Sequence, residues 1–260
     1  MDFRLNSSEG KQILSCIRQG DYAHPGEEEA ISISLGDITP SPTKRALDIG
    51  CGRGGTADWL RRQGWANVVG IDHDADAISY ATSRYTKVSY FNHDVLELGQ
   101  SRLGSFDLIY LFNSFYAFSE QEAALNVLRQ VAAPKASLRI FDYAQATQHA
   151  LPASLGSEIG KPIILDRVEE QLIRAGWQRF EAINLTDSYI TWYGDFLQKL
   201  ISCRDRIVEA HGDDWYDYFA QWYGALHQAL IDGELQGVLI RASANQPSTD
   251  AGTGQLIPGQ

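Results

Sequence analysis

Residues 45–59 read RALDIGCGRGGTADW, an apolar run that leads into a cluster of glycines. The apolar part is typical of a buried strand, and a helical pattern follows over Thr56–Gln63. Gly50, Gly52 and Gly55 match the pattern G-x-G-x-x-G, in which a strand turns into a helix and the backbone approaches a nucleoside closely. The pattern by itself does not separate NAD from other nucleoside ligands.

Apolar runs and helical patterns alternate from this stretch onward, which predicts a parallel sheet covered by helices on both faces. Ser119–Glu122 matches a capping box and predicts the start of a helix over Glu120–Val131. Another helix is predicted over Asp76–Tyr85, and residues 166–185 predict a helix followed by a strand. The other strands are predicted at RALDIG (45–50), NVVGID (67–72), VSYFNHD (88–94), FDLIYLF (106–112), SLRIFDY (137–143) and GVLIRAS (237–243).

Two segments fall outside this alternation. Residues 8–36 predict one or two helices interrupted by GDYAHPG, and residues 187–231 are helical and rich in aromatic side chains. The apolar residues of the second segment recur at helical spacing, which is more typical of a core than of a ligand site. Residues 245–260 are predicted to form a flexible tail.

The composition restricts the partners and the compartment that we expect. With 22 basic and 33 acidic residues the net charge is −11, so no electrostatic attraction to nucleic acid or to an anionic membrane is predicted. The first residues lack the pattern of a signal peptide, and the three cysteines are far apart. We therefore expect a cytoplasmic protein without a bound metal.

Acidic residues stand at the ends of three predicted strands. Asp48 precedes the glycines; its charge would repel a pyrophosphate but favour the ammonium and sulfonium of S-adenosylmethionine. Asp72 ends the next strand, about 20 residues past the glycines, where an acid can bind ribose hydroxyls. Asp94 ends the third strand and can accept a hydrogen bond from an adenine amino group, with His73 and Val95 beside the ring.

The stretches LDIGCGRGG, GIDHD, NHDVLEL and FDLIYLFN resemble, in this order, the motifs of the class I S-adenosylmethionine-dependent methyltransferases. The resemblance spans Arg45–Tyr143 and implies a Rossmann-like, doubly wound α/β fold. The implied sheet has seven strands, of which the last, Gly237–Ala242, is antiparallel. APKAS, residues 133–137, departs from the Pro-Gly-Gly turn that the family usually has. By this resemblance the cofactor-binding residues are Asp48, Gly50, Cys51, Gly52, Asp72, His73, Asp94 and Val95, and Asn113 lies near the sulfonium and the acceptor.

The resemblance also suggests a division of the chain. Residues 1–36 are expected to form an N-terminal helical lid, and residues 37–244 the methyltransferase domain, with residues 187–231 as a helical insertion. This layout is similar to that of phosphoethanolamine and sarcosine/dimethylglycine N-methyltransferases. It implies methyl transfer to a small-molecule acceptor, which we expect to be an amine.

Four residues are predicted to be catalytic or to contact the acceptor. Tyr22 and His24 lie in GDYAHPG, and closure of a lid would bring a polar aromatic group to the line of transfer. Asn113 follows the fourth strand, and Tyr143 ends the fifth. The stretch YLFNSFYAF lacks the histidine of the phosphoethanolamine type, and Ala117 stands near its place.

Two other functions remain open from the sequence. An O-methyltransferase could use Tyr22 or His24 to assist a hydroxyl acceptor. A methyltransferase-like binding protein without catalysis is the second, although such a protein would not need the full set of glycines and acids. A nicotinamide oxidoreductase is disfavoured by Asp48, and the sequence identifies neither the natural acceptor nor the oligomeric state.

Overall fold

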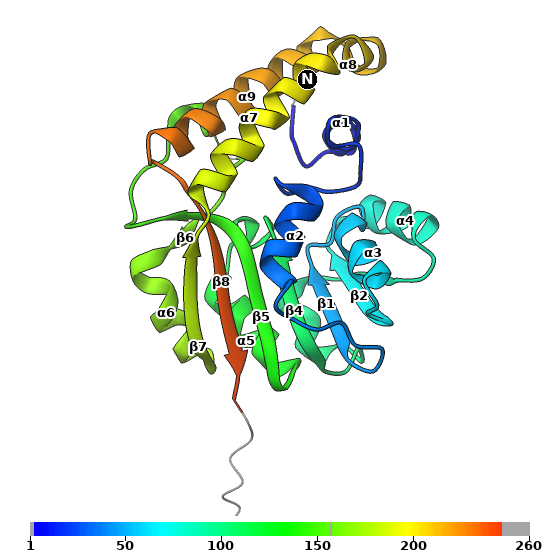
Figure 1. Ribbon diagram of the computed structural model, residues 1–260, viewed down its shortest axis with the longest axis vertical. Helices are drawn as coiled ribbons and strands as arrows, with labels where there is room; N and C mark the ends of the chain where they lie inside the picture. Colours follow the sequence, from blue (N-terminus) through cyan, green and yellow to red (C-terminus); the bar gives the residue numbers. More distant parts are fainter. Residues whose placement is uncertain (1–2, 157, 246–260) are drawn as a thin grey trace, which may run out of the picture.

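The computed structural model describes residues 3–156 and 158–245. They form an α/β fold, in which one mixed β-sheet is flanked by helices (Figure 1). The strand order is β3-β2-β1-β4-β5-β8-β7, and the short strand β6 pairs with β5 beside this path. Strand β8 is antiparallel to both of its neighbours, whereas the other pairs are parallel. The strands are β1 (Arg45–Ile49), β2 (Asn67–Asp72), β3 (Ser89–Asn92), β4 (Phe106–Phe112), β5 (Ala132–Gln145), β6 (Ile163–Ile164), β7 (Trp177–Asn184) and β8 (Gln236–Ala244).

The doubly wound fold with an antiparallel last strand is therefore confirmed. Successive residues of a strand point to opposite faces, so each parallel strand divides its apolar side chains between two cores. In β1, Ala46 packs on one side and Leu47 on the other. The first core includes residues of α2 (Glu27–Leu35), α3 (Gly55–Arg62) and α4 (Ala75–Arg84); the second includes residues of the 3-10 helix η1 (Val95–Gln100), α5 (Gln121–Gln130) and α6 (Leu165–Arg174).

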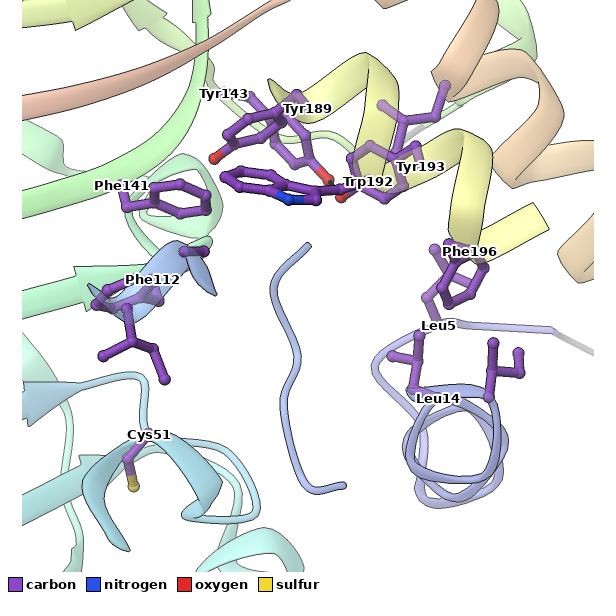
Figure 2. Close-up of a cluster of buried hydrophobic side chains, with 14 of the residues drawn as sticks. Leu5, Leu14, Cys51, Phe112, Phe141, Tyr143, Tyr189, Trp192, Tyr193 and Phe196 are labelled. Carbon is purple, nitrogen blue, oxygen red and sulfur yellow. Dashed lines mark hydrogen bonds between the residues drawn. The ribbon is translucent and has the colours of Figure 1, made fainter. Parts of the chain in front are cut away.

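A helical lobe lies above the carboxyl ends of the central strands (Figure 1). It contains α1 (Ser8–Arg18) together with three later helices, α7 (Thr186–Ser202), α8 (Arg204–His211) and α9 (Asp213–Ile231). Figure 2 shows aromatic side chains of α7 packed on Phe141 and Tyr143 of β5. The ring centroids of Phe141 and Tyr189 are 4.9 Å apart. The aromatic stripes predicted to be core are buried in this way.

Two local details bear on the sequence analysis: the predicted capping box at Ser119–Glu122 and the stretch APKAS at residues 133–137. The predicted capping box is wrong: α5 begins after Glu120, which makes no side-chain cap bond, and Ser119 lines a cavity instead. APKAS, residues 133–137, lies within the observed strand β5, where Lys135 has a left-handed φ of 64°. Of the predicted tail, residues 246–260 lie outside the described residues, and no helix within the described ranges is long and apolar enough to cross a membrane.

Candidate active site at the carboxyl ends of the strands

The glycine loop after β1 borders a cavity of about 620 Å³. Gly50 and Gly52 adopt left-handed φ angles of 70° and 51°, which glycine reaches without a steric penalty. The N–H group of Gly50 donates to the carbonyl of Ile71 at 2.9 Å, so the loop is fastened to the end of β2. A side chain at Gly52 would meet no protein atom within 4 Å, because this residue faces open space at the cavity.

Asp72, the last residue of β2, organises the loops on both sides of it. One carboxylate oxygen accepts the N–H of Gly52 at 2.8 Å, and the other accepts the N–H of Asp74 at 2.9 Å. The side chain of His73 is largely exposed, with its Nδ1 3.5 Å from Asp72. Each carboxylate oxygen can accept a second hydrogen bond, so Asp72 keeps acceptor capacity toward the cavity that it lines.

The segment after β3 forms the adjacent wall. Asp94 caps η1, accepting the N–H of Leu96 at 2.8 Å, and one oxygen atom remains for a ligand. Val95 and Leu96 add apolar surface, and His93 also lines the cavity. A flat apolar ring with a polar edge fits between such groups.

The loop after β4 supplies another part of the lining. Asn113 adopts φ 45°, and its Oδ1 accepts the hydroxyl of Tyr189 at 3.3 Å. Its Nδ2 is buried and has no hydrogen-bond partner among the residues that the structure describes. Since a buried donor without a partner is unfavourable, this amide is suited to donate to a ligand in the cavity. Tyr116 and Phe118 add aromatic surface to the same part of the lining.

The N-terminal segment completes the lining with residues that the sequence analysis missed. Asn6, Lys11 and Ala23 all border the cavity, although α1 and its flanking loops are distant in sequence from the sheet. Lys11 forms an ion pair with Asp74, and both residues line the cavity. No local pattern could have singled out these residues, because their proximity to the strand ends arises only from tertiary packing.

Asp21 fastens the N-terminal segment to the sheet domain. Its carboxylate accepts hydrogen bonds from four side chains of α1, the glycine loop, α4 and the residue after α4: Ser15 at 3.0 Å, Arg53 at 2.9 Å, Tyr80 at 3.2 Å and Tyr85 at 2.7 Å. The sequence analysis did not select Asp21, which lies beside Tyr22 in GDYAHPG. Ala23, two residues after Asp21, lines the cavity, so these hydrogen bonds fix the chain close to that lining position.

Asp21→Ala is expected to loosen this segment while leaving the sheet intact. Because a hydrogen bond to a charged group contributes about 1.5–3 kcal/mol, amide hydrogen exchange over residues 19–26 should become at least about tenfold faster. Glu9→Ala is the matched control, since Glu9 is an exposed acid on the neighbouring α1. Equal exchange rates in the two variants would show that Asp21 does not hold the segment in place.

Seven predicted residues line this cavity, and five do not. Those that line it are Gly50, Gly52, Asp72, His73, Asp94, Val95 and Asn113. Asp48 does not line the cavity: it is 2% exposed, and its carboxyl lies next to the hydroxyl of Tyr110. Burial raises the pKa of Asp48 well above its ordinary value, which favours the neutral carboxyl over the predicted charge. Cys51 is also outside the lining, because its buried thiol belongs to the core.

The three catalytic candidates with ring side chains also lie outside the lining. The Tyr22 hydroxyl donates to Glu28 at 2.9 Å. His24 is buried, its Nδ1–H donates to the carbonyl of Pro25 at 3.1 Å, and its Nε2 lies 3.0 Å from the Thr56 hydroxyl. Burial lowers the pKa of His24 to about 3, and both ring nitrogens are engaged, so this imidazole is not placed to act as a base.

Tyr143 is buried in the aromatic cluster of Figure 2, where its hydroxyl is hydrogen-bonded to that of Tyr193. The structure therefore assigns Tyr143 to the contact between β5 and α7. Asn113 is the one predicted catalytic residue at the cavity. Within the described ranges no group of three or more histidine, cysteine or acidic residues is arranged to hold a metal ion.

Comparison with known proteins agrees with this geometry. Residues 46–135 match the family model described as a methyltransferase domain. The chain is 25% identical to an O-methyltransferase of Pyrenophora dematioidea over 162 residues, 58% of this chain and 60% of the relative. It is 23% identical to glycine/sarcosine/dimethylglycine N-methyltransferase of Actinopolyspora halophila over 252 residues, 88% of this chain and 43% of the relative. The chain thus spans less than two thirds of either relative.

A solved structure shows the same fold. Phosphoethanolamine N-methyltransferase 2 of Haemonchus contortus, in complex with phosphomonomethylethanolamine and S-adenosylhomocysteine, superposes with a TM-score of 0.82 at 18% identity. The match covers 92% of this chain and 58% of that chain, so it includes the helical lobe as well as the sheet.

Proposed function

We propose that the protein transfers a methyl group from S-adenosylmethionine to an amine nitrogen of a small molecule, because residues 46–135 match the family model described as a methyltransferase domain. The observation that carries this proposal is the arrangement of the glycine loop, Asp72 and Asn113 around one cavity of about 620 Å³. A cavity of this size has room for a nucleoside cofactor and a small acceptor.

The lining residues fit the cofactor group by group. Bound S-adenosylmethionine would supply a methyl group made electrophilic by the sulfonium. Asp72 would accept hydrogen bonds from the ribose hydroxyls, and Asp94 would accept one from the adenine amino group. Both would use lone pairs that are not engaged by backbone N–H groups. Gly50 and Gly52 would let the backbone approach the ligand, and the unpartnered amide of Asn113 would donate to the ligand.

The groups near Asn113 favour nitrogen over oxygen as the acceptor atom. Residues 113–119 read NSFYAFS, so this stretch offers an amide, hydroxyls and aromatic rings but no imidazole or carboxylate, and the first carboxylate after it is that of Glu120. A hydroxyl acceptor usually needs a base, whereas an amine needs only to be unprotonated and correctly oriented. Catalysis by this stretch would therefore rest on orientation and the exclusion of water.

The charges of the lining favour an acceptor without a phosphate group. Asp72, Asp74, Asp94 and Glu120 border the cavity, and Lys11 is the one lysine or arginine of the described lining. Lys11 is already paired with Asp74. A phosphate dianion would therefore approach a net negative surface, which is unfavourable at short range. The aromatic faces of Tyr116 and Phe118 suit an ammonium or an apolar group instead.

A matched pair of acceptors tests this proposal. Ethanolamine and phosphoethanolamine share one amine and differ by the phosphate, and release of S-adenosylhomocysteine measures transfer to each. We expect kcat/KM for ethanolamine to exceed that for phosphoethanolamine by at least about tenfold. Glu120→Gln removes one lining charge with little change of shape, and should reduce this preference.

Two results would contradict different parts of the proposal. Faster methylation of phosphoethanolamine would overturn the choice of a phosphate-free acceptor but keep the methyl transfer. Transfer to phenols, with none to any amine in a panel, would favour O-methylation, which the Pyrenophora relative represents.

A further inference from the structure

The loop after β4 carries side chains of the cavity wall, and its regular structure amounts to a single turn of 3-10 helix. It consists of Asn113 and Ser114 followed by the one-turn 3-10 helix η2 (Phe115–Ala117). Asn113, Ser114 and Tyr116 all border the cavity. Such a short segment cannot fix its own conformation, so its geometry depends on contacts from neighbouring elements.

A buried carboxylate beneath this loop supplies those contacts. Asp142, near the carboxyl end of β5, is 0% exposed and does not line the cavity. Its Oδ2 accepts the N–H of Phe115 at 2.8 Å and the N–H of Tyr116 at 3.2 Å. Its Oδ1 accepts the N–H of Tyr143 at 2.7 Å, and the N–H of Ser114 also donates to this carboxylate.

Burying a carboxylate is costly, and none of the salt bridges among the described residues includes Asp142 to compensate. Its cost is offset by backbone N–H groups that would otherwise be buried without acceptors. Two other hydrogen bonds hold the loop, and in both the acceptor is a backbone carbonyl. The N–H of Asn113 donates to the carbonyl of Phe141 at 2.8 Å, and the Ser114 hydroxyl donates to the carbonyl of Ile49 at 2.7 Å. The side chain of Asp142 therefore joins the loop to β5 at the residues between Asn113 and Tyr116.

We propose that Asp142 is a positioning residue for methyl transfer: it fixes the backbone of residues 114–116 and thereby aims the side chains of Asn113 and Tyr116 into the cavity. The inference rests on the proposed function for its catalytic consequence. Asp142 acts through the loop and touches neither the cofactor nor the acceptor.

The protonation state of Asp142 supports a pH-dependent form of this role. Burial raises the pKa of Asp142 to about 7, while the backbone N–H groups oppose that rise. The titratable groups that face it are the hydroxyls of Tyr116 on the loop and Tyr189 on α7. Both are neutral at pH 7, since burial raises the pKa of each still further above the ordinary value of 10. On β8, the register partner of Asp142 is the apolar Val238.

The direction of the effect follows from these contacts. Below pH 7 Asp142 gains a proton, which reduces the number of lone pairs available to the loop, so the hold on residues 114–116 weakens as the pH falls through about 7. Stability runs the other way: the folded protein binds this proton more tightly than the unfolded chain, whose ordinary value is 3.8. The stabilisation from this proton is present below pH 3.8, declines as the pH rises, and is lost above about 7.

Asp142→Asn tests the proposal against Asp107→Asn. Asp107 lies near the opposite end of β4 and accepts the backbone N–H of Arg45 at 2.9 Å, away from the cavity. At saturating cofactor, kcat of Asp142→Asn should fall at least about tenfold, because a small misplacement of orienting groups strongly slows transfer. The Kd of S-adenosylhomocysteine should change by less than about threefold. Asp107→Asn should remain close to the wild type in both measurements.

Two further measurements separate positioning from general structural damage. Amide exchange at Phe115 and Tyr116 should become at least about tenfold faster in Asp142→Asn and stay unchanged in Asp107→Asn. In the wild type, the limb of the pH–rate profile near pH 7 should keep its position with two acceptors of different amine pKa. The same limb should be absent from Asp142→Asn.

Several outcomes would overturn the inference. These are wild-type kcat in Asp142→Asn, unchanged exchange at Phe115 and Tyr116, or an equal loss of activity in Asp107→Asn. If Asp142→Asn does not fold, the wild-type pH profile decides, and a limb that moves with the pKa of the acceptor counts against the proposal. A wild type that transfers no methyl group to any acceptor contradicts the proposed function alone, and the exchange measurement then still tests Asp142.

Discussion

Gly52→Val is expected to lower the affinity for S-adenosylmethionine by at least about 100-fold, close to the limit of detection by calorimetry. Gly52 holds φ 51°, a conformation that a β-branched residue rarely adopts, and it lines the cavity. An added side chain would enter open space where the ligand and the backbone should meet. The N–H group that Gly52 donates to Asp72 at 2.8 Å would also shift as the loop relaxes.

Gly233→Val is the matched control for this loss of affinity. Gly233 has φ 73°, its added side chain would likewise meet no atom within 4 Å, and it is not part of the cavity lining. Both variants should lose a similar amount of stability, about 1–3 kcal/mol, from the left-handed backbone. Unchanged cofactor affinity in a folded Gly52→Val protein would remove the glycine loop from the site.

Asp72→Ala is the second change with a large expected effect, a loss of affinity for S-adenosylmethionine of about 10- to 150-fold. The carboxylate fixes the backbone of Gly52 and Asp74 and keeps lone pairs for ribose hydroxyls. Removing it therefore loosens the loop and deletes charge-assisted hydrogen bonds to the ligand. Calorimetric titration of the cofactor measures the change.

Asp76→Ala removes an equal charge from the first turn of α4, at an exposed residue outside the cavity lining. It should bind the cofactor with an affinity close to that of the wild type, since screened surface charges have small effects. An Asp72→Ala protein that binds as tightly as Asp76→Ala would show that Asp72 contributes only general charge.

Some residues of the candidate site can be predicted from the local sequence pattern, and others cannot. Gly50, Gly52, Asp72, Asp94 and Asn113 could be predicted because each stands at the end of a strand. The carboxyl ends of parallel strands share one edge of the sheet, so a position in the linear pattern is also a position at the cavity. The helices α3 and α4 and the antiparallel strand β8 follow from equally local periodicity and from the family resemblance.

The direction of a side chain was harder to predict than the position of its backbone. Asp48 was expected to face a cation, yet it pairs in register with Tyr110 of β4 and is buried with its carboxyl next to the Tyr110 hydroxyl. Tyr143 was expected at the cavity, and its hydroxyl is instead hydrogen-bonded to that of Tyr193 on α7. Whether a strand-end side chain reaches the ligand depends on which neighbour occupies the space beside it.

The sequence by itself determined the Rossmann-like sheet, the glycine loop and the acidic strand ends, because hydrophobic periodicity and turn chemistry act over a few neighbouring residues. Only the tertiary structure decided that Lys11 of α1 would border the cavity and that Asp142 would lie beneath the loop after β4. These contacts join segments far apart in the chain, and their geometry is set by how the lobe and the strands pack together. Burial then decides the chemistry, since it leaves His24 neutral and brings the pKa of Asp142 to about 7.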